Sequence, residues 1–339
     1  MHARAPPRPY LRARVPPLPV TLTQSLLSMA GGVVLLLAGA EGLVRGASAL
    51  ALRLGITPLV VGLTVVAIGT SSPELVVSVQ AALAGQGGVA IGNVVGSNVA
   101  NLGLIVGLSA ALSPMAIDRG LIRQDMPIML GTMVLLAAFL VDGELVRWEG
   151  GLLLAGAVAY TVWKIRASRR DVRTEREAVP PEVESVLADT QPGFKRHVLF
   201  VAGGVALLVY GSDLLLDGAI AAATSLGVSE AVVGLTLVAL GTSLPELATT
   251  VVAALRGEGE IALGNAVGSN IYNVLSVLGP AALAVPMASA GVGADVLAVM
   301  VGFGLLTLLF LISGGRTRRW EGGVLLASYV GYLWWVVQG

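Results

Sequence analysis

Apolar stretches long enough to cross a bilayer follow one another along the chain, separated by short polar segments. A spanning helix needs about 20 mostly apolar residues. The pattern predicts ten such helices, at residues 26–50, 56–83, 89–112, 121–141, 148–166, 197–225, 229–255, 260–284, 293–313 and 320–337. Backbone groups inside a bilayer must be satisfied within the protein, so the expected fold class is an all-α polytopic membrane protein.

Two polar segments fall outside this pattern. Residues 1–25 are rich in Arg and Pro, which predicts a disordered tail before an uncleaved first helix. Residues 167–196 are expected to form a polar cytoplasmic linker between a first five-helix repeat at 26–166 and a second at 197–339. With the linker in the cytoplasm, 16 of the 21 basic residues lie on that side. The positive-inside rule then predicts that both termini lie outside, although the four arginines of the tail oppose this orientation.

The two halves of the chain repeat one another. Residues 62–107 align with residues 234–279 without a gap, and 26 of the 46 positions are identical at an offset of 172. Five spans are an odd number, so the second copy must enter the membrane from the opposite side. Inverted repeats with broken helices at their centre are typical of secondary transporters, whose ion sites lie near the membrane midplane.

The composition narrows the possible chemistry. Apolar residues make up 55% of the chain and charged residues 12%, whereas soluble domains are roughly 25% charged. The 21 basic and 21 acidic residues balance, so we expect no nucleic-acid partner. The absence of Cys excludes thiolate sites, and both His residues lie in polar segments. We therefore expect oxygen-based ion chemistry in a lipid bilayer, with no enzyme activity, no cofactor and no obligate protein partner.

Matching polar residues interrupt the apolar stretches of both repeats. Glu74 and Glu246 each follow a proline, which removes a backbone donor and opens the helix. We expect the freed carbonyls of Ala67 and Ala239 to become cation ligands beside the carboxylates. The candidate metal site comprises Glu74, Glu246, Asn101, Asn273, Thr70, Ser71, Thr242, Ser243, Ser97, Ser269, Ala67 and Ala239. The amides of Asn93, Asn98, Asn265 and Asn270 fit a site or helix packing equally well.

A site of oxygen ligands with two carboxylates fits a hard cation. Ca²⁺ takes about 6–8 oxygen ligands, whereas Mg²⁺ demands tighter geometry, and Cu, Ni and Zn prefer N or S donors. Two unpaired buried charges would be costly to carry between access states, so Na⁺, H⁺ or another Ca²⁺ must refill the site. This predicts exchange rather than a channel. A hydrolase using Ser71, Ser72 or Ser243 would need a base, and the aligned segments 62–107 and 234–279 hold no His or Lys.

Two paired motifs stand out in the repeats: GTSSPE (69–74) with GNVVGSN (92–98), and GTSLPE (241–246) with GNAVGSN (264–270). They resemble the two α-repeats of the cation/Ca²⁺ exchanger superfamily, particularly its prokaryotic sodium/calcium exchangers. The resemblance implies that Glu74 and Glu246 are the central Ca²⁺ ligands, that the other candidate residues join them, and that some form flanking Na⁺ sites. It also implies that the first and sixth helices slide against a static core.

The resemblance implies antiport of Ca²⁺ and Na⁺ in a prokaryotic inner membrane. Sodium-coupled relatives can carry Asp at one of the positions corresponding to Asn101 and Asn273, and this chain has Asn at both. The site therefore holds two carboxylates rather than three. Exchange of H⁺ for Ca²⁺, or for another divalent cation, is the alternative.

Overall fold

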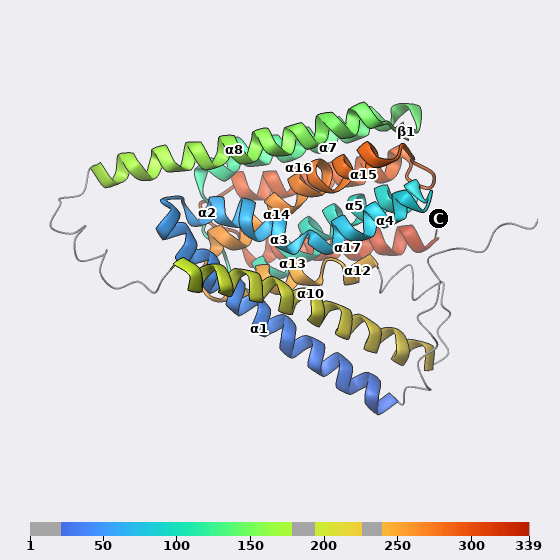
Figure 1. Ribbon diagram of the computed structural model, residues 1–339, viewed down its shortest axis with the longest axis horizontal. Coiled ribbons are helices and arrows are strands. Elements are labelled where there is room, and N and C mark those ends of the chain that lie inside the picture. Colours follow the sequence, from blue (N-terminus) through green and yellow to red (C-terminus); the bar gives the residue numbers. More distant parts are fainter. Residues whose placement is uncertain (1–21, 178–193, 226–238, 339) are drawn as a thin grey trace, which may run out of the picture.

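The computed structural model describes residues 22–177, 194–225 and 239–338, which are almost entirely helical (Figure 1). The elements of the first half are α1 (Leu22–Leu54), α2 (Pro58–Val61), η2 (Gly62–Val66), α3 (Ala67–Thr70), α4 (Ser72–Leu83), α5 (Gly87–Ala100), η3 (Asn101–Val106), α6 (Gly107–Leu112), η4 (Leu121–Asp125), α7 (Met126–Phe139), η5 (Leu140–Asp142), β1 (Glu144–Leu145) and α8 (Arg147–Glu177). Those of the second half are α10 (Phe194–Ser225), α12 (Ala239–Gly241), α13 (Leu244–Leu255), α14 (Gly259–Tyr272), η7 (Asn273–Leu278), α15 (Gly279–Ala284), β2 (Met287–Ala288), α16 (Ala294–Ile312) and α17 (Arg319–Gln338).

Helices cover the described part of every predicted span. In these ranges, six helices are long and apolar enough to cross a membrane, and a bent pair, Pro58–Thr70 with Ser72–Leu83, makes a seventh. α8 continues to Glu177, past the predicted end of its span at residue 166. Ala, Arg and Glu in this extension are good helix formers, so the first part of the predicted linker is helical. The last four residues of the predicted tail, 22–25, are helical and belong to α1. Residues 1–21 and the middle of the linker lie outside the described residues.

Each half contains a helix that breaks just before a proline. The break at Ser71 (φ −79°, ψ 9°) bends the helix by 46°, and Pro73 lies in the first turn of α4. The second half repeats the break at Ser243 (φ −89°, ψ 5°), with Pro245 in the first turn of α13. Proline fits there because backbone donors in the first helical turn have no intrahelical partner.

A second irregularity lies in the helix that carries the Asn-rich motif. α5 passes into the π-helical turn η3 at Asn101, and α14 passes into η7 at Asn273. A π turn adds a residue to the helical repeat and rotates the side chains around it, and such turns recur at functional sites. Both predicted site amides therefore stand where a helix changes its winding.

Contacts between the halves recur with the partners exchanged. β1 pairs antiparallel with β2, and Glu144 lies opposite Ala288. Shifting these positions by the repeat offset of 172 (144 + 172 = 316; 288 − 172 = 116) gives the isolated bridge between Ala116 and Arg316. Exchanged pairs of this kind are what an approximate two-fold relation between the halves produces.

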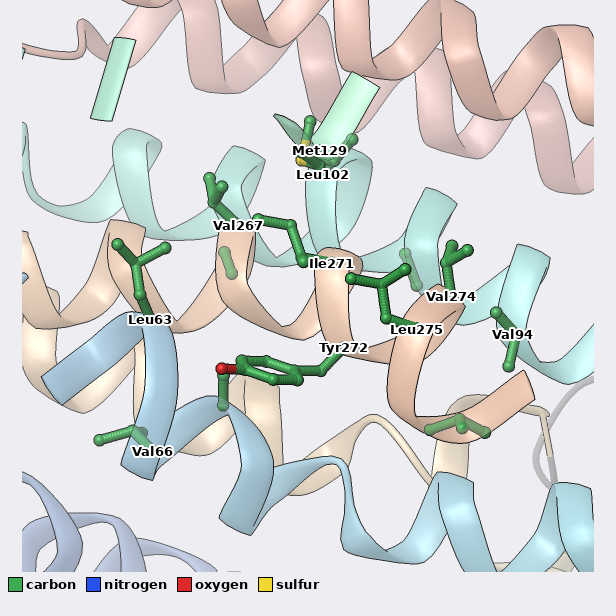
Figure 2. Packing of buried hydrophobic residues seen from close by; sticks show 14 of the residues in the cluster. Leu63, Val66, Val94, Leu102, Met129, Val267, Ile271, Tyr272, Val274 and Leu275 are labelled. Atoms are coloured by element: carbon green, nitrogen blue, oxygen red, sulfur yellow. The ribbon is translucent and has the colours of Figure 1, made fainter. Parts of the chain in front are cut away.

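The run from α14 through η7 to α15 forms the centre of the bundle. In its most apolar stretch 94% of the residues are buried, against 33% in α1 and 22% in α10. Figure 2 shows Ile271, Tyr272 and Leu275 of this run in the same core as Leu63 and Val66 of η2. The Asn-rich motif of the second half therefore lies inside protein, where its amides cannot be solvated by lipid or bulk water.

α1 and α10 lie side by side at the edge of the bundle (Figure 1). Glycines bring their backbones together: a Cβ atom on Gly204 would lie 2.8 Å from the carbonyl oxygen of Gly39, and one on Gly32 would lie 2.7 Å from that of Gly211. Small residues that let two helices approach closely are typical of helix pairs in membranes.

We expect Gly204→Ala to destabilise the protein by about 1–3 kcal/mol, because the added methyl group must push the two helices apart. Gly203→Ala is the matched control, since a Cβ atom there meets no described atom within 4 Å. The measurement is the thermal unfolding of both purified variants in one detergent. Equal unfolding temperatures would contradict the close packing of α1 against α10.

Candidate cation site

The two predicted carboxylates meet where the halves of the chain join. Glu74 and Glu246 are fully buried in the first turns of α4 and α13. The hydroxyl of Ser71 donates to Oε1 of Glu246 at 2.9 Å, and that of Ser243 donates to Oε1 of Glu74 at 3.2 Å. Each carboxylate is thus held by the serine at the helix break of the other half. The hydroxyl of Ser97 lies 3.2 Å from that of Ser243, which adds α5 to the cluster.

Several buried oxygens at predicted site positions have no hydrogen-bond partner within the described part of the chain. They are Oε2 of Glu74, Oε2 of Glu246, Oγ of Ser269, Oδ1 of Asn101 and Oδ1 of Asn273. The elements that carry them pack together: α4 contacts α5 and η7, and α13 contacts α14 and η3. Buried polar atoms are nearly always bonded, so unpaired oxygens concentrated in neighbouring elements are what a cation site requires.

The ligand set combines carboxylates with neutral oxygens. Among the described residues, no group of three or more His, Cys, Asp or Glu side chains is arranged to hold a metal. The two carboxylates supply a charge of −2, and hydroxyl and amide oxygens supply the remaining donors. Hard cations such as Ca²⁺ and Na⁺ accept such ligands, whereas soft metals do not.

The threonines at the helix breaks are tied to amides of the other half. Thr70 donates to Oδ1 of Asn265 at 3.1 Å, and Nδ2 of Asn265 donates to Thr250 at 2.9 Å. The equivalent residues repeat these two hydrogen bonds. Thr242 donates to Oδ1 of Asn93 at 3.4 Å, and Nδ2 of Asn93 donates to Ser78 at 3.1 Å. The sequence left open whether Asn93 and Asn265 belong to a cation site or to helix packing. In the structure their amide oxygens accept the hydroxyls of the two threonines. Ser78 and Thr250 were not predicted, although their hydroxyls match at the offset of 172.

At the first helix break, the backbone carbonyl that loses its donor to proline is not the one expected from the sequence. The carbonyl of Ala67 accepts the N–H of Ser71 at 3.0 Å, and the hydroxyl of Thr70 lies 3.3 Å from it. The donor that Pro73 lacks would have served the carbonyl four residues earlier, that of Gly69. At the second break the corresponding carbonyl, Gly241, accepts the hydroxyl of Ser212 at 2.6 Å.

The two site amides differ in their surroundings. Nδ2 of Asn273 donates to Oδ1 of Asn98 at 3.1 Å, and Nδ2 of Asn98 donates to the carbonyl of Asn270 at 3.4 Å. Neither polar side-chain atom of Asn101 has a partner in the described ranges. The hydrogen bonds of the two repeats therefore differ at this pair of equivalent residues.

A second polar cluster lies outside the site and was not predicted. Nζ of Lys164 and Oδ2 of Asp125 form an ion pair at 2.7 Å, with side chains only 5% and 0% exposed. Lys164 is one of the 16 basic residues that the positive-inside rule assigns to the cytoplasmic side. The structure buries its side chain against η4. The hydroxyl of Tyr160 donates to the other oxygen of Asp125 at 3.0 Å. One pattern in the sequence could have indicated this cluster. Tyr160 and Lys164 are four residues apart, which places both side chains on the same face of α8.

A bundle of apolar helices with two buried carboxylates and unpaired neutral oxygens is the architecture of a membrane cation transporter. The sodium/calcium exchanger protein family model matches residues 24–166 and 196–338. The chain therefore belongs to this family, whose members are membrane antiporters of the calcium transport class and not enzymes.

Relatives and solved structures match over nearly the whole chain. CaxA of Alkalimonas amylolytica is 38% identical over 305 residues, which cover 89% of this chain and 95% of CaxA. The sodium/calcium exchanger MaX1 of Methanosarcina acetivorans is 36% identical over 345 aligned positions, 92% of this chain and 98% of MaX1. A structure of the sodium-calcium exchanger NCX_Mj superimposes with a TM-score of 0.80 at 31% identity and covers 93% of this chain and 98% of its own.

Proposed function

We propose that this protein exchanges Ca²⁺ for Na⁺ across a prokaryotic inner membrane, by alternating access to the site around Glu74 and Glu246. One observation carries the proposal: the second oxygens of both fully buried carboxylates have no partner in the described part of the chain, and neither do three neutral oxygens of neighbouring elements. Their combined charge of −2 balances one Ca²⁺ ion.

The proposed ligands divide into two roles. Glu74, Glu246, Asn101, Asn273 and Ser269 offer unpaired oxygens directly. The hydroxyl of Ser97 on α5 and the hydroxyls at the helix breaks complete the Ca²⁺ site and flanking Na⁺ sites. Those at the breaks belong to Thr70, Ser71, Thr242 and Ser243. The carbonyls of Ala67 and Ala239 would join them, and that of Ala67 would exchange its present bond with the N–H of Ser71 for the ion.

Two features support exchange rather than free diffusion of one ion. Two carboxylates lie in one buried cluster, so an ion leaving it exposes uncompensated charge to a low dielectric, which opposes movement of the empty protein. The cluster also joins the halves through the Ser71–Glu246 and Ser243–Glu74 hydrogen bonds, so a bound ion bridges both halves.

The proposed topology has ten spans in two inverted five-helix repeats, with both termini outside and the linker in the cytoplasm. Contacts that recur with exchanged partners support two related halves. One relative, the inner membrane protein YrbG of Escherichia coli, is 38% identical over 257 residues, which supports the inner membrane as location.

The coupling ion is tested by ⁴⁵Ca²⁺ uptake into proteoliposomes that contain the purified chain. We expect uptake when Na⁺ is loaded inside, and none when only a pH gradient or no gradient is imposed. Uptake driven only by the pH gradient would replace Na⁺ with H⁺ as the coupling ion. Uptake without any gradient at a rate that a counterion does not change would contradict antiport altogether.

A further inference from the structure

The residue next to one site amide is anchored outside the site. Tyr272 immediately precedes Asn273, is 2% exposed, and its hydroxyl lies 2.6 Å from that of Thr161 on α8. The hydroxyl of Thr161 also lies 2.7 Å from the carbonyl of Ala157, to which it donates. Because Thr161 has one proton to donate, Tyr272 must be the donor in their bond. The start of η7 is therefore tied to α8.

The anchor continues into the buried ion pair. The rings of Tyr160 and Tyr272 meet edge to face, with centroids 6.0 Å apart. The hydroxyl of Tyr160 donates to Asp125 at 3.0 Å, and Asp125 binds Lys164 at 2.7 Å. Both oxygens of this carboxylate are thus used, so the pair holds α8 and η4 in one geometry against the helix that carries Asn273.

This network joins the two halves once and is not repeated at the equivalent positions. At the offset of 172, the counterpart of Tyr272 is Ala100 (272 − 172), that of Asp125 is Leu297 (125 + 172) and that of Lys164 is Val336 (164 + 172). Only Tyr160 has a like counterpart, Tyr332. Asn101 follows Ala100, the position where this anchor is missing, and it is the amide that has no partner among the described residues.

We infer that Tyr272 is a positioning residue for Asn273, so that the two amides of the site act unequally. This inference rests on the proposed function. Asn273, held through Tyr272 and Asn98, presents its oxygen at a fixed place and sets the size of ion that the site accepts. Asn101, without such a hold, moves with the ion. A rigid ligand discriminates between ions of different radius, whereas a mobile one accommodates both.

The test is Tyr272→Phe, which keeps the buried ring and removes the hydroxyl. We expect the KM for Ca²⁺ in the exchange assay to rise roughly two- to tenfold, the range that one net hydrogen bond supplies. We also expect the preference for Ca²⁺ over the larger Sr²⁺ to fall, with the maximal rate per folded transporter retained. Thr161→Val removes the other partner of the same bond, so it should have the same effect, and the double variant should add little.

Tyr332→Phe is the control. It removes the hydroxyl of the residue equivalent to Tyr160, in the half where the position equivalent to Asp125 is Leu297. It should leave KM and the Ca²⁺/Sr²⁺ ratio unchanged. A purely structural role of Tyr272 would lower the number of folded transporters without changing that ratio, and this result would overturn the inference. Equal changes in Tyr272→Phe and Tyr332→Phe would overturn it as well.

Failure of the inference is separable from failure of the proposed function. If the wild-type chain exchanges Ca²⁺ and loses this activity on Glu74→Gln, but Tyr272→Phe has no effect, only the positioning role is wrong. If Glu74→Gln leaves exchange intact, the site itself is wrong.

Discussion

Glu74→Gln and Glu246→Gln are each expected to reduce Ca²⁺ exchange on the order of 1000-fold while the protein still folds. Glutamine keeps the shape of the side chain, and its carbonyl can still accept the hydrogen bond from Ser243 or Ser71. The change removes one of two charges that face a divalent ion. A unit charge about 4 Å from another is worth about 4 kcal/mol at the effective dielectric of a protein.

The measurement is the initial rate of ⁴⁵Ca²⁺ uptake, normalised to transporter recovered as a single peak in size-exclusion chromatography. Glu321→Gln is the matched control: Glu321 is also buried, but its oxygens accept from Ser313 at 3.0 Å and from the backbone of Arg318 at 2.7 Å. It should retain exchange. Substantial exchange by either site variant would remove the carboxylate pair from the mechanism.

Lys164→Met is expected to destabilise the protein by about 3–5 kcal/mol, because it leaves the carboxylate of Asp125 buried without its cation. The double variant Asp125→Leu with Lys164→Met should recover most of this loss. It installs apolar side chains in both places, as the other half does with Leu297 and Val336. Replacing both partners of a buried ion pair is often neutral or stabilising.

Thermal unfolding of the single and double variants in detergent checks this expectation. Tyr160 loses its acceptor in the double variant, so we expect a small residual destabilisation. If the double variant is as unstable as Lys164→Met alone, the cost does not come from an unpaired carboxylate, and the ion pair is not what holds α8 against η4.

The carboxylates and the repeat could be predicted from the sequence because both are local patterns. A run of about 20 apolar residues predicts a membrane-spanning helix regardless of its neighbours, because the thickness of the bilayer sets the length of every span. Glu74 and Glu246 stand out because a carboxylate in an apolar stretch is costly without a role. The expected membrane exchanger and its family are confirmed by the family match over both halves.

Other features depend on how distant segments meet. The π-helical turns η3 and η7 begin at Asn101 and Asn273, and no helical period in the sequence predicts them. The carbonyl of Ala67 was expected to be free, yet the register of the helix break satisfies it. A helical period alone cannot distinguish these cases, because both depend on which backbone donors lie within reach.

By itself the sequence determined that this is a polytopic membrane protein of two related halves, each contributing one buried carboxylate and a set of hydroxyls and amides. Those properties follow from hydropathy, residue chemistry and repetition along the chain. Only the tertiary structure decided that Ser71 holds Glu246, that Lys164 is buried, and that Asn101 and Asn273 differ. These are contacts between residues far apart in sequence, and their hydrogen-bond geometry is set by packing rather than by any local pattern.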